Sequence, residues 1–176
     1  MSNTHASDRK RQHKGYTLFL SMCLFANVIA AKETESAGSG VDELVRETYS
    51  LIFDDDYAQA MIKADECLRV AEKTNGPNHP DMSLCLNAKA LVHASQEQFS
   101  LAEKLYLQAL AIDEKALGPD DVSVADDLDA LASIYEVQSQ FEKARNYYDR
   151  VLLIREKALG KEALEVAEVL HSIAGI

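Results

Sequence analysis

Few side chains in this chain have the type and spacing that support catalysis or metal binding. The sequence contains no Gly-x-Ser-x-Gly, no phosphate-binding glycine loop, no His-Glu-x-x-His and no Cys-x-x-Cys. The acidic run at 54–56 lacks the downstream glycine and glutamate of a calcium loop, and His79 stands in a Gly-Pro-Asn-His-Pro turn. We interpret both as turn residues, and we expect neither an enzyme nor a bound metal or cofactor.

Two cysteines could form a disulfide. Cys67 and Cys85 each lie nine residues from Gly76, so two antiparallel helices joined at this glycine would bring them opposite each other. The residues at the equivalent of Cys67 in the repeat described below are Ala109 and Val151, which indicates a buried position for a small side chain. This comparison favours two separate thiols over a bridge.

The composition indicates which elements must position these residues. The 176 residues are 27% charged and 47% hydrophobic, which is typical of one modest folded domain. Only three prolines and seven glycines occur, and Ala, Leu and Glu recur throughout. These residue types favour helices over strands, so we predict an all-α fold.

The charge distribution restricts the partners. The net charge is −11, and because residues 1–31 carry +3, the remainder carries −14. This much negative charge repels phosphate backbones and anionic lipid headgroups. We therefore expect no nucleic acid and no membrane surface as partner of the folded part, and favour a protein or peptide with basic segments.

The first 31 residues are typical of an export signal. A basic cluster at 9–14 precedes an uncharged apolar run at 15–31, which ends in Val-Ile-Ala-Ala, the small residues that a signal peptidase requires. The alternative is an uncleaved membrane anchor. Either one places the domain outside the cytosol, in the periplasm or cell envelope or in the medium. Residues 32–40 are small and polar and predict a flexible linker, and 41–176 the folded domain.

The domain repeats itself with a period of 42 residues. This spacing relates Gly76, Gly118 and Gly160, and the columns that share it are Tyr57, Phe99 and Phe141; Ala60, Ala102 and Ala144; Leu68, Leu110 and Leu152; Leu86, Leu128 and Leu170. Apolar residues within each unit recur at helical spacing, and each glycine ends a helix. Each unit is therefore a helix pair, and pairs of this kind must stack to bury their apolar faces.

Seven helices are predicted, at 41–54, 57–75, 81–96, 99–117, 122–138, 141–159 and 162–176. They should stack antiparallel in about three and a half repeats. Asp81 and either Asp120 or Asp121 are the expected N-terminal caps of the helices that follow the Gly-Pro turns.

The repeat resembles the tetratricopeptide family, in the 42-residue form of kinesin light chains. The residues that carry the resemblance are Leu128, Leu131, Ala132, Tyr135, Ala144 and Tyr148, together with the segment Ala-Leu-Ala-Ile-Asp-Glu-Lys-Ala-Leu-Gly-Pro-Asp at 109–120. HEAT and armadillo repeats have similar periods, but the Ala-x-x-x-Tyr-x-x-Ala spacing at 102, 106 and 109 favours the tetratricopeptide type. The chain departs from the family at Glu97 and Ser139, which occupy turns where the family often has glycine.

The resemblance implies a right-handed superhelical solenoid whose first helix in each pair lines a concave groove for a peptide or partner helix. It places Asn87, Asp129 and His171 in one column of that groove, where an amide or carboxylate can bond to a ligand backbone. Neighbouring groove positions are Asp126, Ser133 and Glu136, so the central groove should be acidic. The alternative for these side chains is a solvated polar surface.

The last predicted helix, 162–176, has no second helix to cover it. Leu164, Val169 and Ile176 lie outside the expected core stripe, and they indicate either self-association or a longer array. We therefore expect a non-catalytic scaffold that binds a partner. The alternatives are a membrane-tethered or self-associating spacer, or an accessory subunit of an envelope complex.

Overall fold

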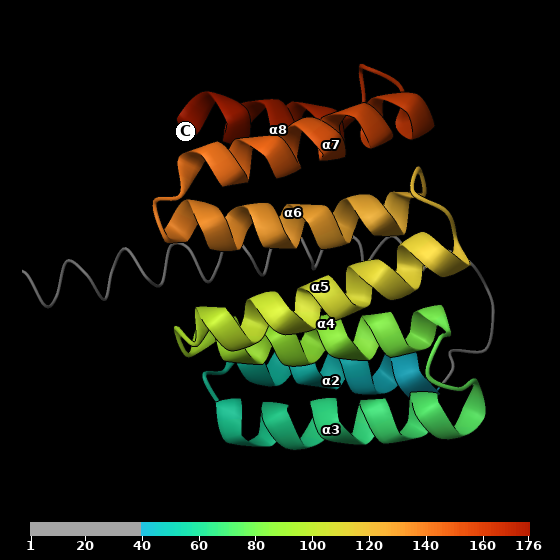
Figure 1. Cartoon of the computed structure of the whole chain (residues 1–176). Helices are drawn as coiled ribbons and strands as arrows, with labels where there is room; N and C mark the ends of the chain where they lie inside the picture. Colours follow the sequence, from blue (N-terminus) through green and yellow to red (C-terminus); the bar gives the residue numbers. More distant parts are fainter. Residues whose placement is uncertain (1–39) are drawn as a thin grey trace, which may run out of the picture.

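Seven helices joined by short turns make up the part of the chain that the structure describes, residues 40–176 of a computed structural model (Figure 1). The helices are α2 (Gly40–Phe53), α3 (Tyr57–Thr74), α4 (Pro80–Ser95), α5 (Phe99–Ala116), α6 (Val122–Val137), α7 (Phe141–Leu159) and α8 (Leu164–Gly175). No strand occurs among these residues. The all-α prediction is confirmed, and each predicted boundary lies within two residues of the observed one.

The 42-residue period sets where the helices begin. Tyr57, Phe99 and Phe141 are the first residues of α3, α5 and α7, while α4, α6 and α8 begin at Pro80, Val122 and Leu164. The same aromatic position therefore starts the second helix of every pair.

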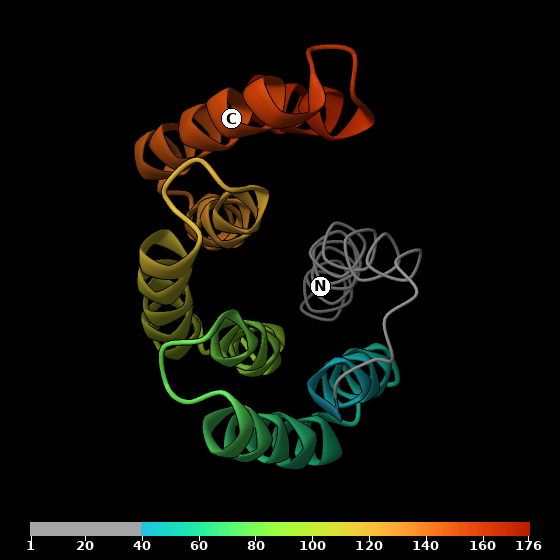
Figure 2. The same ribbon diagram turned by 90° about the vertical axis from the view of Figure 1, so that its right-hand side faces the viewer.

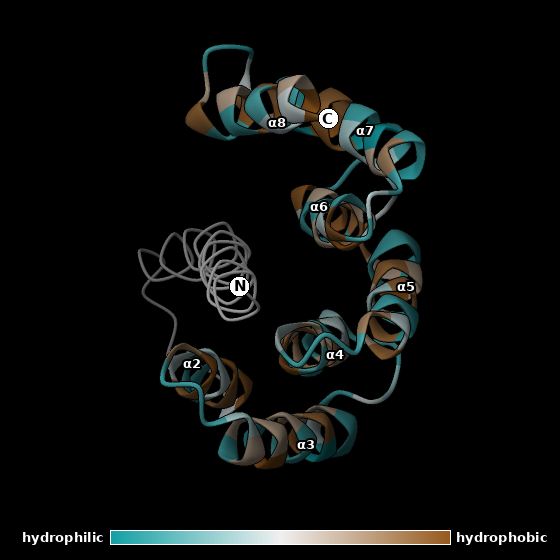
Figure 3. Cartoon of the chain, turned by 90° about the vertical axis from the view of Figure 1, so that its left-hand side faces the viewer, coloured by the Kyte–Doolittle hydropathy of each residue, from teal (hydrophilic) through white to brown (hydrophobic). Residues whose placement is uncertain are grey.

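The helices form a curved stack. Viewed along their axes, α2, α4 and α6 lie on the inside of the curve and α3, α5 and α7 on the outside (Figures 2 and 3). The alanines at 60, 102 and 144, at the start of each outer helix, are completely buried. Side chains this small let the outer helix pack closely against its inner partner.

The glycines at the ends of the outer helices have positive φ, as a helix-ending glycine should. The φ angles are 86° at Gly76, 97° at Gly118 and 87° at Gly160. At Gly160 ψ is 156°, so this residue occupies a backbone region that is nearly exclusive to glycine.

The turns from inner to outer helices also contain one residue of positive φ each, and none of these is glycine. They are Asp55, Glu97 and Ser139, with φ of 60°, 62° and 58°. Left-handed backbone explains why the family prefers glycine at this position. In this chain an acidic or hydroxyl-bearing residue adopts it instead.

Side chains cap the helices at positions that the sequence predicted only in part. Asp121 caps α6 by accepting a hydrogen bond from the backbone of Ser123 at 2.9 Å, as expected. The cap of α4 is His79, whose Nδ1 accepts from the backbone of Asp81 at 3.2 Å. The prediction of Asp81 as cap is wrong, because Pro80 already begins the helix.

Two apolar cores meet in α4. The first joins α2, α3 and α4 and includes Tyr49 and Leu91, and the second extends from α4 to α8 and includes Tyr106 and Leu128. Since α4 contributes buried residues to both, it links the first pair to the rest of the array.

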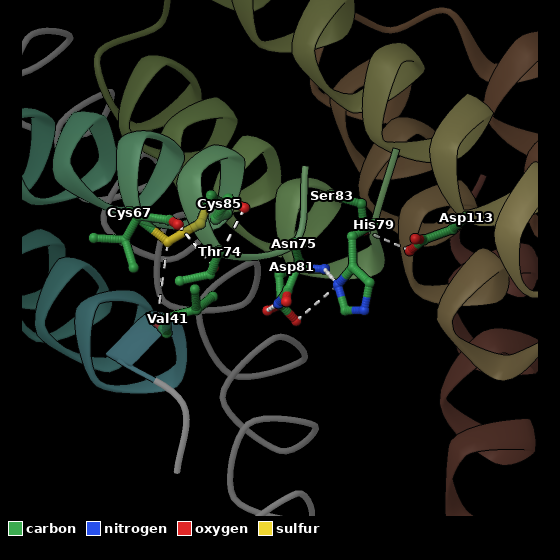
Figure 4. A network of polar contacts seen from close by, with 11 residues as sticks. Val41, Cys67, Thr74, Asn75, His79, Asp81, Ser83, Cys85 and Asp113 are labelled. Atoms are coloured by element: carbon green, nitrogen blue, oxygen red, sulfur yellow. Dashed lines mark hydrogen bonds and ion pairs between the residues drawn. A yellow bond between two sulfur atoms is a disulfide. The ribbon is translucent and has the colours of Figure 1, made fainter. Parts of the chain in front are cut away.

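Cys67 of α3 and Cys85 of α4 form a disulfide, so our preference for separate thiols is wrong (Figure 4). Their Cα atoms are 5.5 Å apart, and both residues are completely buried in the first core. The repeat position was correctly identified as small and buried. The sequence also placed Cys85 opposite Cys67, but only the structure shows that the two cysteines lie within bonding distance.

The last helix packs differently from the prediction. Val169 is only 2% exposed and belongs to the second core, and Ile176 packs against the same core. Leu170 is 48% exposed, although its repeat equivalent Leu128 is completely buried. Val169 is therefore a core residue and Ile176 is partly buried against the core, whereas Leu164, at 71% exposure, lies outside the core as predicted, and so does Leu170.

No helix in the described range is long and apolar enough to cross a membrane. The predicted export segment, 1–31, and all but the last residue of the predicted linker lie outside the described residues.

The disulfide should contribute measurably to stability. Because the bridge closes a loop with a sequence separation of 18, its reduction is expected to lower the free energy of unfolding by about 3 kcal/mol. Urea unfolding with and without reductant measures this loss. A Cys67→Ala/Cys85→Ala variant is the control and should not respond to reductant. Alkylation of both cysteines in denaturant without reductant would show that no bridge had formed.

Candidate functional site

The predicted central groove residues lie together along one side of α6. Asp126, Asp129, Ser133 and Glu136 are spaced three or four residues apart, which places them on one helix face. All four are partly exposed. We call this set the α6 polar stripe.

Arg155, a residue that the sequence analysis did not select, joins the two aspartates of the stripe. Its Nη2 lies 3.0 Å from Asp126 Oδ1 and 3.0 Å from Asp129 Oδ2, and its side chain is only 5% exposed. The guanidinium comes from the outer helix α7, so this contact also fastens α7 to α6.

The ion pairs shift the pKa values of their members. Burial raises the pKa of Asp129, and the charge of Arg155 opposes that rise. Burial alone would lower the pKa of Arg155, yet the two carboxylates raise it above its ordinary value. The guanidinium therefore stays charged and compensates one of the two carboxylates.

The other end of the stripe contacts Tyr148. The hydroxyl of Tyr148 donates a hydrogen bond of 2.8 Å to Glu136 Oε2 and lies 3.4 Å from the Ser133 hydroxyl. A tyrosine hydroxyl adds no positive charge to the stripe. Asp126, Asp129, Glu136 and Arg155 together carry a formal charge of −2.

The column of Asn87, Asp129 and His171 does not present three equivalent side chains. Asn87 is 7% exposed, and its Nδ2 donates to Asp127 Oδ1 at 2.5 Å. Asp129 pairs with Arg155, and His171 is exposed on α8. The 42-residue register places these residues at equivalent positions, but each faces a different neighbour.

Asp127 is a second residue that the sequence analysis missed. It is 1% exposed, and burial raises its pKa to about 8, assisted by the nearby carboxylates of Asp113, Asp126 and Glu114. The signal was present in the repeat, because the equivalent positions hold Cys85 and Val169, both buried. An aspartate at a position where the other repeats have buried apolar or sulfur-containing side chains could therefore have been recognised from the sequence as a buried acid.

A similar signal points to Arg155. The three equivalent segments before the glycines read Ala71-Glu72-Lys73, Asp113-Glu114-Lys115 and Arg155-Glu156-Lys157. Only the first position changes its charge between repeats, from neutral to acidic to basic. No group of three or more His, Cys, Asp or Glu able to hold a metal occurs within residues 40–176.

Replacing Arg155 should destabilise the fold. Arg155→Met leaves Asp126 and Asp129 next to each other without a cation, so the free energy of unfolding should fall by about 3 kcal/mol. Thermal or urea unfolding measures the loss. The matched control is Arg150→Met on the same helix, whose exposed pair with Glu114 should contribute less than about 1 kcal/mol. Equal effects of the two substitutions would contradict a structural role for Arg155.

The repeat pattern matches known sequence families. Two family descriptions, each named tetratricopeptide repeat, match residues 50–115 and 125–171. No curated protein sequence matches the chain.

Solved structures share the fold. The nearly identical tetratricopeptide-like repeats of a kinesin light chain type of protein from Podosopora anserina superpose with a TM-score of 0.68 at 20% identity, over 76% of this chain and 63% of that one. A variant of that protein with one glutamine replaced by methionine gives 0.67 at the same identity and coverage. BtubC (BKLC) from P. vanneervenii gives 0.71 at 20% identity, over 94% of this chain and 64% of that one.

The chain thus spans somewhat less than two thirds of the length of these structures. At 20% identity the likeness concerns the fold, a solenoid of helix pairs. The 42-residue period, the helix pairs and both sequence matches agree, and the chain belongs to the tetratricopeptide repeat family.

Proposed function

We propose that this chain is a non-catalytic scaffold that binds a peptide or partner protein with basic segments through the α6 polar stripe. Tetratricopeptide repeats mediate protein–protein interaction, so a protein partner follows from the family. The acidic character of the site is our own inference. It rests on the arrangement of the stripe on the inner helix α6, in which two of the three carboxylates share the guanidinium of Arg155 from α7 and the third accepts a hydrogen bond from Tyr148.

The geometry suits recognition of a basic segment. Arg155 holds Asp126 and Asp129 in place from the buried side, so their oxygens do not have to be ordered when a ligand binds. Tyr148 holds Glu136 in the same way. A lysine or arginine of the partner would form charge-assisted hydrogen bonds with these oriented carboxylates.

We also propose export as the setting of this interaction. The basic and apolar segment at 1–31 predicts a signal peptide or an uncleaved anchor, and the domain would then work in the periplasm, in the cell envelope or outside the cell. The Cys67–Cys85 disulfide supports this proposal, because such bridges persist in oxidising compartments.

Peptide binding tests the stripe. An extended peptide with alternating lysines should bind the protein, and its affinity should fall as the salt concentration rises, because screening weakens contacts between exposed charges. The double variant Asp129→Asn/Glu136→Gln keeps the side-chain shapes and removes two charges. It should weaken binding at least about tenfold, or about 1.4 kcal/mol, in fluorescence anisotropy.

A matched variant controls for net charge. Glu142→Gln/Asp149→Asn removes two charges from exposed positions on the outer helix α7 and should bind as the unmodified protein does. A glutamate version of the peptide should not bind. Equal binding by the two double variants would refute the stripe as the site.

A second candidate function, self-association, is favoured by the uncovered face of α8. Its residues Ala167, Leu170 and Ala174 are exposed, whereas the equivalent residues of α6, Ala125, Leu128 and Ala132, are completely buried. The outer helix α7 follows α6, and no helix follows α8 in the described part of the chain. A second copy docked there would make the chain a self-associating spacer, or an accessory subunit within an envelope complex.

Self-association predicts a clear effect at Leu170. Leu170→Asp should weaken a dimer at least about thirtyfold, since it places a charge where a leucine side chain would be buried. Sedimentation or light scattering over a concentration series measures the change. Leu153→Asp, at a 66% exposed position on α7, is the control. Val169→Asp is unsuitable because Val169 is a core residue, and a protein that is monomeric throughout would exclude this function.

A further inference from the structure

Four polar side chains are buried together where α4, α5 and α6 meet. Ser83 and Asn87 come from α4, Asp113 from α5 and Asp127 from α6, and their exposed fractions are 0%, 7%, 3% and 1%. We call this set the buried acid cluster. It lies between the second and third helix pairs, apart from the ion pairs of the α6 polar stripe.

Two hydrogen bonds connect the cluster across the helices. The Ser83 hydroxyl donates to Asp113 Oδ2 at 2.6 Å (Figure 4), and Asn87 Nδ2 donates to Asp127 Oδ1 at 2.5 Å. Three further oxygens have no hydrogen-bond partner, namely Asn87 Oδ1, Asp113 Oδ1 and Asp127 Oδ2. The nearby hydroxyl of Tyr106 is also buried without a partner.

The charged groups that act on Asp127 are all acidic. Asp113 and Glu114 face it from α5, and Asp126 lies beside it on α6. Two buried tyrosines, Tyr49 of α2 and Tyr106 of α5, are close enough to be affected by its charge. Asp121 in turn acts on Asp113.

No basic residue among those described compensates these carboxylates. The nearest candidate by repeat position is Arg155, but its guanidinium is bound to Asp126 and Asp129. Position 155 is the equivalent of 113, so the third repeat places a cation where the second places an acid. The third repeat therefore has ion pairs at this position, and the second repeat has none to any residue that the structure describes.

The fold itself does not require an acid at position 127. The equivalent residues are Cys85 and Val169, at 0% and 2% exposure, so a sulfur atom or an aliphatic side chain fills this place in the neighbouring repeats. A buried carboxylate without a cation is strongly unfavourable, and protonation removes most of that penalty. Protonation would also turn Asp127 Oδ2 into a donor within a cluster whose unpartnered oxygens include Asn87 Oδ1 and Asp113 Oδ1.

We propose that the buried acid cluster is a proton-binding site, in which Asp127 holds a proton at neutral pH and its loss weakens the junction between the second and third helix pairs. The ligand is the proton, and the partners that fix its position are Asn87 at one carboxyl oxygen and Asp113 as the neighbouring acid. The proposal is argued from the cluster's own contacts and does not require that a peptide binds at the stripe.

The sign of the pH effect follows from the direction of the shift. Burial raises the pKa of Asp127 to about 8, above the ordinary value of 3.8 that the unfolded chain has, and burial likewise raises the pKa of Asp113. The folded protein then binds more protons than the unfolded chain between these two values. The contribution of Asp127 to stability is complete below pH 4 and is lost as the pH rises to about 8.

Unfolding at a series of pH values tests the site in the purified protein. Because the folded protein binds one more proton than the unfolded chain, its folding equilibrium constant should fall by up to about tenfold for each pH unit between pH 5 and 8. Asp127→Asn keeps the acceptor for Asn87 and places an amide where the protonated oxygen would be. Relative to the unmodified protein, this variant should gain at least about tenfold in its folding equilibrium constant between pH 5 and pH 9.

The control is Asp149→Asn, which removes an exposed acid on α7 and should change stability equally at all these pH values. Carboxyl carbon NMR of the unmodified protein provides a readout that does not depend on a variant. The Asp127 resonance should titrate with a midpoint above about 6.5. A midpoint near 4, or parallel pH profiles for Asp127→Asn and the unmodified protein, would overturn the proposal.

Discussion

The stacking of each helix pair on the next is the interaction on which this structure depends. An inner helix such as α4 is buried on several sides, because it contacts its own outer helix and both neighbouring pairs, and it contributes to both apolar cores. A single pair would leave most of these surfaces in water, so the pairs are stable only together. The fully buried alanines at 60, 102 and 144 make this packing close enough to exclude water.

Because the stacked helices bury equivalent positions in every repeat, a single polar residue at such a position determines which contacts form around it. Position 71 of the first unit is alanine, position 113 of the second is aspartate and position 155 of the third is arginine, and all three are buried. Each of the three lies near the end of the outer helix of its pair. The first packs in an apolar environment, the second joins a cluster of uncompensated acids and the third binds two aspartates.

The two acidic features therefore serve different purposes in our interpretation. The α6 polar stripe is partly exposed and is ordered by Arg155 and Tyr148, as suits recognition of a basic partner. The buried acid cluster lies one helix face away, has no cation and is closed to solvent, as suits a proton. Burial and the presence of one guanidinium distinguish them, although both include aspartates of α6.

The sequence by itself determined the helix pairs, their number and their boundaries. A 42-residue period and positive-φ glycines are local properties, and they repeat along the chain often enough to be read without a structure. The family resemblance predicted Asp126, Asp129, Ser133 and Glu136 as neighbouring positions, and their spacing of three or four residues places them on one helix face. The resemblance also placed Asn87 at the position equivalent to Asp129.

Only the tertiary structure decided which partner each of these side chains meets. Cys67 bonds to Cys85, Asp129 pairs with Arg155 and Asn87 bonds to Asp127, and each contact joins different helices. The period relates equivalent positions in successive repeats, but the residue opposite each position is on another helix and changes from repeat to repeat. The distances between side chains of different helices, and how deeply those side chains are buried, therefore had to be known before the disulfide, the ion pairs and the hydrogen bonds could be identified.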